Sequence, residues 1–267
     1  MALTGPAGHS TNLLGVPTGL LASAAFNDFP VPLHISGVRE TNRPFFRQLD
    51  DAAGLGQAAQ LFQDYMDVVF GLDRERDAAD GKRRYRSSYL RLLKGWGFDA
   101  NSQEGAVLKG WVESRFGLFP TFHKAPLARF SSPAWAAYVE EKMSSRFHNN
   151  SISLQLDLLY EFCQWAFSRW PSAGRRHLTL YRGVNDFVEH PLIQQARNRE
   201  AVVRLNNLVS FSADRAVADE FGDYILEARV PTAKVLFFND LLPRHPLKGE
   251  AEYLVIGGDY RVKVSYV

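Results

Sequence analysis

Hydrophobic positions change their spacing about two thirds of the way along the chain. From about residue 55, apolar residues recur every three or four positions, which is the period of a helix that buries one face. This spacing predicts a helix from about 55 to Phe70 and further helices near 82–95, 104–115, 133–146 and 151–170. The predicted helix at 151–170 has the clearest pattern, because Asn150 or Ser151 can cap its start and Pro171 and Gly174 can end it.

The last third of the chain has the short alternating pattern of strands. Strands are expected at 178–182, 208–212, 223–230, 234–238, 252–256 and 260–267, with a short helix at 216–221. A chain that is helical first and strand-rich later belongs to the α+β class. We therefore expect a helical region, 1–170, packed on a strand-rich core, 171–267, as one compact unit.

The first 45 residues are rich in Gly, Pro, Asn and Thr, so an extended, loop-dominated segment is expected there. Residues 13–24 resemble a signal peptide and end in an A-x-A-like triplet. However, no Lys or Arg precedes this stretch, and Pro17 and Gly19 interrupt it. We interpret it as an ordered segment folded onto the body of the protein.

Composition narrows the classes of function. Hydrophobic residues make up 46% of the chain, as in an ordinary globular protein. The formal net charge is only +2, so the chain lacks the overall positive charge that would attract nucleic acid. Its single cysteine, Cys163, rules out an internal disulfide framework and fits a reducing cytoplasm. No run of eighteen apolar residues occurs, so no membrane span is expected.

Three motifs carry little weight. Residues 54–59 match the dinucleotide fingerprint G-x-G-x-x-A, but no buried strand precedes them, so the start of a helix is the preferred interpretation. The seven histidines lack metal-ligand spacing, so no metal site is predicted. The basic run 81–86 is typical of a solvated helix start, with contact to an acidic partner or a phosphate as the alternative.

Two carboxylates, Glu250 and Glu252, stand at the start of the predicted strand 252–256. In an extended strand, residues two apart project to the same side. Holding two like charges together costs free energy, so the pair is either a solvated strand end or a device that grips a cation. Taken alone, the solvated end is the more common situation.

Two upstream elements change that balance. Arg182 stands at a predicted strand end before a turn at Gly183, and Ser210 and Ser212 alternate on the strand 208–212. Arg182, this S-x-S and the E-x-E, in this order, resemble the arginine-specific mono-ADP-ribosyltransferases of the R–S–E class. Many relatives have Thr where this chain has Phe211, which we expect to point into the core.

The resemblance can be narrowed with residues 8–17, Gly-His-Ser-Thr-Asn-Leu-Leu-Gly-Val-Pro, and with the layout of the whole chain. These are similar to the NAD⁺–dinitrogen-reductase ADP-ribosyltransferases of nitrogen-fixing bacteria. That resemblance implies an ADP-ribosyltransferase-type mixed β core, NAD⁺ as substrate, dinitrogenase reductase as acceptor and a PII-type nitrogen signal protein as regulator. It also implies that the helical region recognises the acceptor or the regulator.

The resemblance assigns roles to the site residues. Glu252 would stabilise the positive charge that develops on the ribose as nicotinamide leaves. Glu250 would grip the acceptor arginine and accept its proton. Arg182, beside Gly183, would supply positive charge for the NAD⁺ phosphates, and Ser210 would hold the ribose or support Glu252, with help from Ser212. In the family, the loop corresponding to 239–249 contacts the acceptor protein.

Two alternatives stay open at this stage. The first is an arginine ADP-ribosyltransferase or NAD glycohydrolase with another protein target. The second is a catalytically silent module that binds NAD or a protein. The intact pair of Glu250 and Glu252 argues against the silent module, because loss of activity would not be expected to spare both carboxylates.

Overall fold

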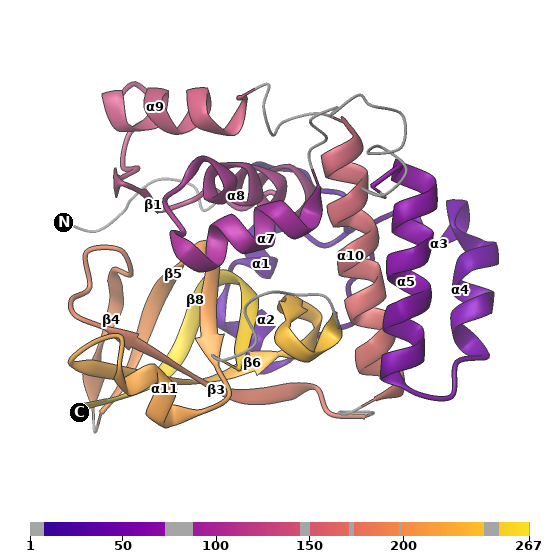
Figure 1. The fold of residues 1–267 in the computed structure, drawn as a ribbon. Helices are drawn as coiled ribbons and strands as arrows, with labels where there is room; N and C mark the ends of the chain where they lie inside the picture. Colours follow the sequence, from indigo (N-terminus) through magenta and orange to yellow (C-terminus); the bar gives the residue numbers. More distant parts are fainter. Residues whose placement is uncertain are drawn as a thin grey trace.

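Helices occupy most of the chain up to Arg169, and strands dominate after it (Figure 1). The computed structural model describes residues 8–72, 88–144, 150–170, 174–197, 199–242 and 251–266. The longer helices are α5 (Leu55–Phe70), α7 (Tyr89–Phe98), α8 (Gln103–Phe116), α9 (Pro133–Lys142) and α10 (Asn150–Arg169). The predicted α+β class is confirmed.

Helix α10 is the central helix of the helical part. Its apolar positions are buried over almost its whole length, and Phe162 stacks on Phe62 of α5 with ring centroids 4.3 Å apart. Each fully buried side chain of this size contributes roughly 1.5–3 kcal/mol. Helix α10 also packs on β7 (Val235–Phe238), so it joins the helices to the sheet.

The N-terminal segment is more helical than its composition predicts. Instead of an extended loop it forms α1 (Thr18–Leu21), α2 (Ala24–Asp28), α3 (Val38–Thr41) and α4 (Arg43–Asp50). These pieces are too short to be stable alone and are held by tertiary contacts, for instance from the backbone N–H of Asp259 to the carbonyl of Ala22 at 2.7 Å. The expectation that residues 13–24 fold onto the body is confirmed.

Several predicted helix boundaries shift. Helix α7 runs to Phe98 where an end near 95 was expected, and the first part of the predicted helix 82–95 lies outside the described residues. Gly54 is the N-cap of α5, and the turn before it follows α4, so the glycine-rich stretch is a helix start, as preferred from the sequence. A small hairpin, β1 (Phe122–His123) with β2 (Ala125–Pro126), had no prediction.

The sheet contains β3 (His177–Val184), β4 (Leu192–Arg197), β5 (Glu200–Ser212), β6 (Tyr224–Pro231), β7 and β8 (Glu252–Tyr266), in the order β4-β5-β3-β6-β8-β7. Strands β5 and β8 also pair with each other, which closes β5, β3, β6 and β8 into a ring. All pairings between the described strands are antiparallel, where a mixed core was expected. The short helix α11 (Arg215–Asp219) packs on β3, and the single-turn 3-10 helices η1 (Thr232–Lys234) and η2 (Asn239–Leu241) flank β7.

Strand β8 bends at Gly257 and Gly258, and this bend replaces the break expected between two separate strands. A Cβ on Gly257 would lie 1.7 Å from the carbonyl oxygen of Asn206, and Gly258 has φ +118°. The pairing with β5 shifts register between Leu205 and Leu208 at the same level. The bend lets one strand pair with β5, β6 and β7 in turn.

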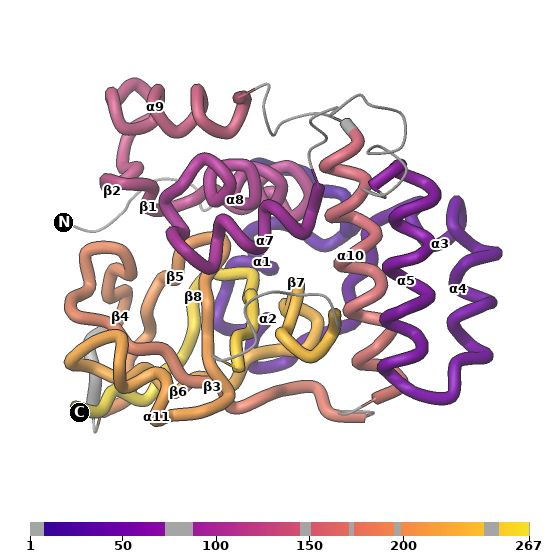
Figure 2. The backbone as a smooth tube through the Cα atoms, viewed as in Figure 1, coloured from indigo at the N-terminus to yellow at the C-terminus, as the bar shows by residue number. Residues whose placement is uncertain are grey.

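The backbone tube shows which helices cover the sheet (Figure 2). Helices α7 and α8 lie over one end of β5 and β8, α10 lies beside β7, and α1 and α2 lie behind the strands. One buried hydrophobic cluster contains side chains from both the helical region and the strand-rich core.

Candidate active site

Three strands meet where the sequence places its candidate site. The Cα of Ser212 on β5 is the register partner of both Tyr181 on β3 and Glu252 on β8. Arg182, Ser210 and Glu252 therefore come to the same end of the sheet, although 70 residues separate the first from the last. Helix α7 covers this end (Figure 1).

Ser210 and Glu252 are joined by a short hydrogen bond. The Ser210 hydroxyl donates to Glu252 Oε1 at 2.6 Å across the diagonal of the β5–β8 pair. Trp96 of α7 donates its indole N–H to the same hydroxyl at 2.8 Å. Glu252 is 6% exposed, so its carboxylate is held by neighbours rather than by bulk water.

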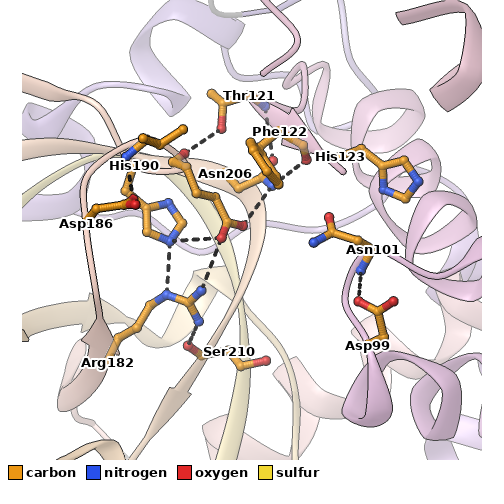
Figure 3. A network of polar contacts seen from close by, with 12 residues as sticks. Asp99, Asn101, Thr121, Phe122, His123, Arg182, Asp186, His190, Asn206 and Ser210 are labelled. Carbon is orange, nitrogen blue, oxygen red and sulfur yellow. Dashed lines mark hydrogen bonds and ion pairs between the residues drawn. The ribbon is translucent and has the colours of Figure 1, made fainter. Parts of the chain in front are cut away.

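Arg182 lies next to Ser210 and His190, and its hydrogen bonds go to these neutral groups (Figure 3). Its Nη1 donates to the backbone carbonyl of Ser210 at 2.8 Å, its Nε donates to His190 Nε2 at 3.0 Å, and its Nη2 is 3.8 Å from Glu189. Burial lowers the pKa of the guanidinium, while Glu189 and Glu252 raise it in opposition. The result is a positive charge held inside the protein beside two carboxylates.

His190 serves Arg182 as a neutral acceptor. It is 1% exposed, and burial, together with the nearby Arg182, puts its pKa well below the usual value. A neutral imidazole can accept the Arg182 hydrogen bond at Nε2 only when Nδ1 carries the proton. Arg182 is thereby oriented by two neutral acceptors in addition to its longer ion pair with Glu189 at 3.8 Å.

A second layer of polar groups includes Asn206, Phe122 and Thr121 (Figure 3). Asn206 of β5 contacts Glu189 Oε1 at 3.4 Å and donates to the carbonyl of Phe122 at 2.8 Å. The backbone N–H of Thr121 donates back to Asn206 at 3.1 Å. Lys109 of α8 is fully buried nearby, and burial lowers its pKa to about 8, although Glu189 favours its charged form. The site therefore depends on α8 and the β1 segment as well as on the sheet.

Gly183 and Ser212 have roles in packing. Gly183 lies inside β3 rather than at a turn, and a Cβ there would be 2.2 Å from the carbonyl oxygen of Ala218 in α11. The predicted turn at Gly183 is therefore wrong, because β3 continues to Val184. The Ser212 hydroxyl accepts from the backbone N–H of Asp214 at 3.0 Å, which fixes the approach to α11.

Glu250 lies outside the described residues, as does the loop before it from 243 to 249. Strand β8 begins at Glu252, and Ala251 before it has φ +45°, in the left-handed region. The expectation that Glu250 and Glu252 project to the same side therefore stays a prediction.

Phe211 is 2% exposed, which confirms that it points into the core. Sequence reasoning missed Trp96, Glu189 and His190. Trp96 follows Leu92 by four positions, so it has the pattern of an ordinary core residue of a helix. Glu189 and His190 belong to a polar loop without a motif. Only the meeting of α7, this loop and the sheet identifies them as neighbours of the site.

Among residues 8–72, 88–144, 150–170, 174–197, 199–242 and 251–266, no three His, Cys, Asp or Glu side chains gather as a metal site would require. Within the same ranges, no helix has both the length and the apolar character needed to cross a membrane.

Comparison with known proteins finds a matching family. Residues 11–264 match the model of the dinitrogenase reductase ADP-ribosyltransferase family. The chain is similar to the NAD(+)–dinitrogen-reductase ADP-D-ribosyltransferase of Rhodospirillum rubrum, with 63% identity over 265 residues, 97% of this chain and 96% of the relative. No solved structure matches the chain.

Proposed function

The chain belongs to the dinitrogenase reductase ADP-ribosyltransferase family, and on that premise we propose that it transfers ADP-ribose from NAD⁺ to an arginine of dinitrogenase reductase. The transfer would release nicotinamide and inactivate the acceptor, which is the iron protein of nitrogenase. The observation that carries the proposal is the linkage of Arg182, Ser210 and Glu252 by hydrogen bonds at one end of the sheet.

Glu252 is the group proposed to act on the sugar. When the bond between nicotinamide and ribose C1′ breaks, its electron pair leaves with nicotinamide and positive charge develops on the ribose. A carboxylate fixed beside the ribose stabilises that charge more in the transition state than in the ground state. The hydrogen bond from Ser210 to Glu252 Oε1 orients the carboxylate.

Glu250 is the group proposed to act on the acceptor. An arginine guanidinium is protonated at any working pH, so it becomes a nucleophile only if it loses a proton as its nitrogen bonds to C1′. A carboxylate can hold the planar fork and accept that proton. The balance is NAD⁺ plus arginine giving ADP-ribosylarginine, nicotinamide and one proton.

Arg182 is proposed to attract the diphosphate of NAD⁺. Its charge is buried, its hydrogen bonds go to the Ser210 carbonyl and to His190, and the nearby Glu189 and Glu252 favour the charged form. Ser210, Ser212 and Gly183 line the same strand ends and are the proposed NAD⁺ contacts with it. Of the segment 239–249, Asn239, Leu241 and Leu242 are buried, so the proposed contact with the acceptor is 243–249, which lies outside the described residues.

The remaining partners follow from the family. We place the reaction in the cytoplasm, where NAD⁺ and the acceptor occur, and the single cysteine fits that compartment. The helical region 1–170 is proposed to recognise the acceptor or a PII-type nitrogen signal protein. The reaction needs no metal, because carboxylates and an arginine supply the charges.

The direct test is incorporation of label. Purified protein, ³²P-labelled NAD⁺ and dinitrogenase reductase should yield one ADP-ribose per modified acceptor site, located on arginine by mass spectrometry. Absence of incorporation by folded protein that binds NAD⁺ would overturn the proposal. Modification of other proteins in preference to dinitrogenase reductase would favour a transferase with a different target.

Glu250→Gln tests whether Glu250 and Glu252 have different roles. The variant should lose transfer to arginine but keep part of its hydrolysis of NAD⁺. When water is the nucleophile, no guanidinium has to give up a proton. Release of nicotinamide and label on the acceptor are measured in the same reaction. Normal transfer by Glu250→Gln would show that Glu250 is not the group that binds the acceptor arginine.

A further inference from the structure

The helical region supplies a polar contact to the candidate active site. Trp96 lies on α7, more than 100 residues before Ser210, and its indole Nε1 is 2.8 Å from the Ser210 hydroxyl. Trp96 is 3% exposed and therefore cannot offer its ring to a substrate as large as NAD⁺. Any effect on the reaction must pass through the groups that it touches.

The chemistry of an indole fixes the direction of this contact. The indole N–H can only donate, whereas a serine hydroxyl donates one hydrogen and accepts at its oxygen. With Trp96 donating, the Ser210 oxygen is occupied as an acceptor and its hydrogen is directed at Glu252 Oε1, 2.6 Å away. The three groups therefore form a relay of donors that ends on the carboxylate.

Helix α7 is held in place at its first turn and beside Trp96. The backbone N–H of Tyr89 donates to Gln155 of α10 at 2.9 Å, and Ser88 caps the helix through the N–H of Arg91. Lys109 of α8 lies 5.9 Å from the centre of the Trp96 ring. These contacts hold the indole where its N–H faces the sheet.

From this geometry we infer that Trp96 is a positioning residue for the transferase reaction, which acts by orienting the Ser210 hydroxyl toward Glu252. The inference rests on the proposed function and deepens it. It gives α7 a part in forming the NAD⁺ site, separate from the recognition of protein partners proposed for the helical region.

Trp96→Phe keeps an aromatic ring and removes the donor. Without the indole N–H, the Ser210 hydroxyl can rotate away from Glu252, so kcat should fall about tenfold, the effect of one hydrogen bond, with little change in KM for NAD⁺. Because a hydrogen bond to the ionised form lowers a carboxylate pKa, the acidic limb of the rate profile should move to higher pH.

Trp165→Phe is the matched control. Trp165 is 5% exposed, lies on α10, and donates its indole N–H to Asp50 at 3.0 Å, far along the chain from the site. It should lose stability as Trp96→Phe does, with kcat and the pH profile unchanged. Equal effects of the two substitutions on kcat would overturn the inference.

A double-variant cycle tests the route through Ser210. In the Ser210→Ala background, Trp96→Phe should change kcat less than twofold, and in Ser210→Thr, which keeps a hydroxyl, the tenfold effect should return. If Trp96→Phe still lowers kcat about tenfold in the Ser210→Ala background, the relay would be overturned.

If Ser210→Ala folds poorly, the contact can be tested by NMR, which does not require enzymatic activity. In wild-type protein labelled with ¹⁵N, the indole resonance missing from Trp96→Phe is assigned to Trp96. That resonance should shift in Glu252→Gln and change less in Ser210→Thr, which keeps the hydroxyl, while the Trp165 resonance shifts in neither. A Trp96 resonance that does not move in Glu252→Gln would overturn the relay, whereas failure of the proposed function would appear as wild-type protein that does not transfer ADP-ribose.

Discussion

Two buried networks in this protein join an arginine and a glutamate, but they treat the charges differently. In the first, Glu161 of α10 accepts from Arg39 at 2.5 Å, contacts His34 at 3.1 Å and accepts from the backbone N–H of Ile35 at 2.6 Å. The opposite charges touch, and the result ties the N-terminal segment to the central helix.

In the candidate site, Ser210 stands between the charges. Its backbone carbonyl accepts from Arg182 and its hydroxyl donates to Glu252. A contact of this kind orients each charged group without neutralising it. The comparison teaches that a direct ion pair ties two segments together, whereas under the proposed function the Ser210 network would present a cation and an anion to a ligand that carries a diphosphate and a developing positive charge.

The sharpest test of that difference is Glu252→Gln, which keeps the shape and removes the charge. Transfer should fall by about 10²–10³, the effect of removing one group that stabilises transition-state charge. Unfolding and NAD⁺ binding should change little. Glu227→Gln, on the exposed Lys263 pair of β6 and β8, is the control. A Glu252→Gln variant with more than a tenth of normal activity would place the essential carboxylate elsewhere.

Glu161→Gln should show the opposite pattern. Loss of the charge weakens the bonds from Arg39 and Ile35 and should lower the free energy of unfolding by about 2 kcal/mol, the worth of a hydrogen bond to a charged group. Because Arg39 is partly exposed, water can solvate it and limit the loss. Activity of the folded fraction should stay normal. Urea unfolding measures the first quantity, and a specific activity reduced tenfold at full folding would contradict the comparison.

Arg182→Lys tests whether the geometry of the cation matters. Lysine keeps the charge but cannot bind the Ser210 carbonyl and His190 together with a planar fork. The KM for NAD⁺ should rise about tenfold, since one such difference is worth roughly 1.4 kcal/mol. Arg115→Lys breaks a two-pronged pair with Asp157 in the helical part and serves as the control. It should lower stability and leave KM unchanged.

The smallest expected effect is the contribution of Lys234 to the pH dependence of the free energy of unfolding. It is fully buried, donates to the carbonyl of Gly257 at 3.0 Å, and burial lowers its pKa from 10.5 to about 7. Between about pH 7 and 10.5 the unfolded chain binds a proton that the folded chain lacks, so this group makes stability rise with pH.

The slope from Lys234 is at most about 1.4 kcal/mol per pH unit. In Lys234→Met the slope of urea unfolding at pH 7.5, 8.5 and 9.5 should fall by about that amount, and the part that remains above about pH 8 is expected from Lys109, whose pKa is lowered to about 8. Lys263→Met, which replaces an exposed lysine of β8, should keep the wild-type slope. A slope that is unchanged in Lys234→Met would assign the pH dependence to other groups.

Much of the fold is visible in local patterns. The apolar period of α10 and the short apolar runs of β3, β5 and β6 predict these elements, and α10 and β5 are buried on nearly all sides. The pattern does not predict α1 to α4, whose few turns depend on contacts such as Ala22 with Asp259. It also misses β4, which pairs with β5 through two register shifts.

The sequence by itself determined the α+β class, the order of Arg182, Ser210 and Glu252, and the family that this order resembles. These depend on residue types and spacing, which a chain carries without folding. Only the tertiary structure decided that Ser210 contacts both charged residues, that Gly183 is needed against α11, and that Trp96 joins the site from α7. Each is a contact between segments far apart in the chain, and its geometry is fixed by packing rather than by any local pattern.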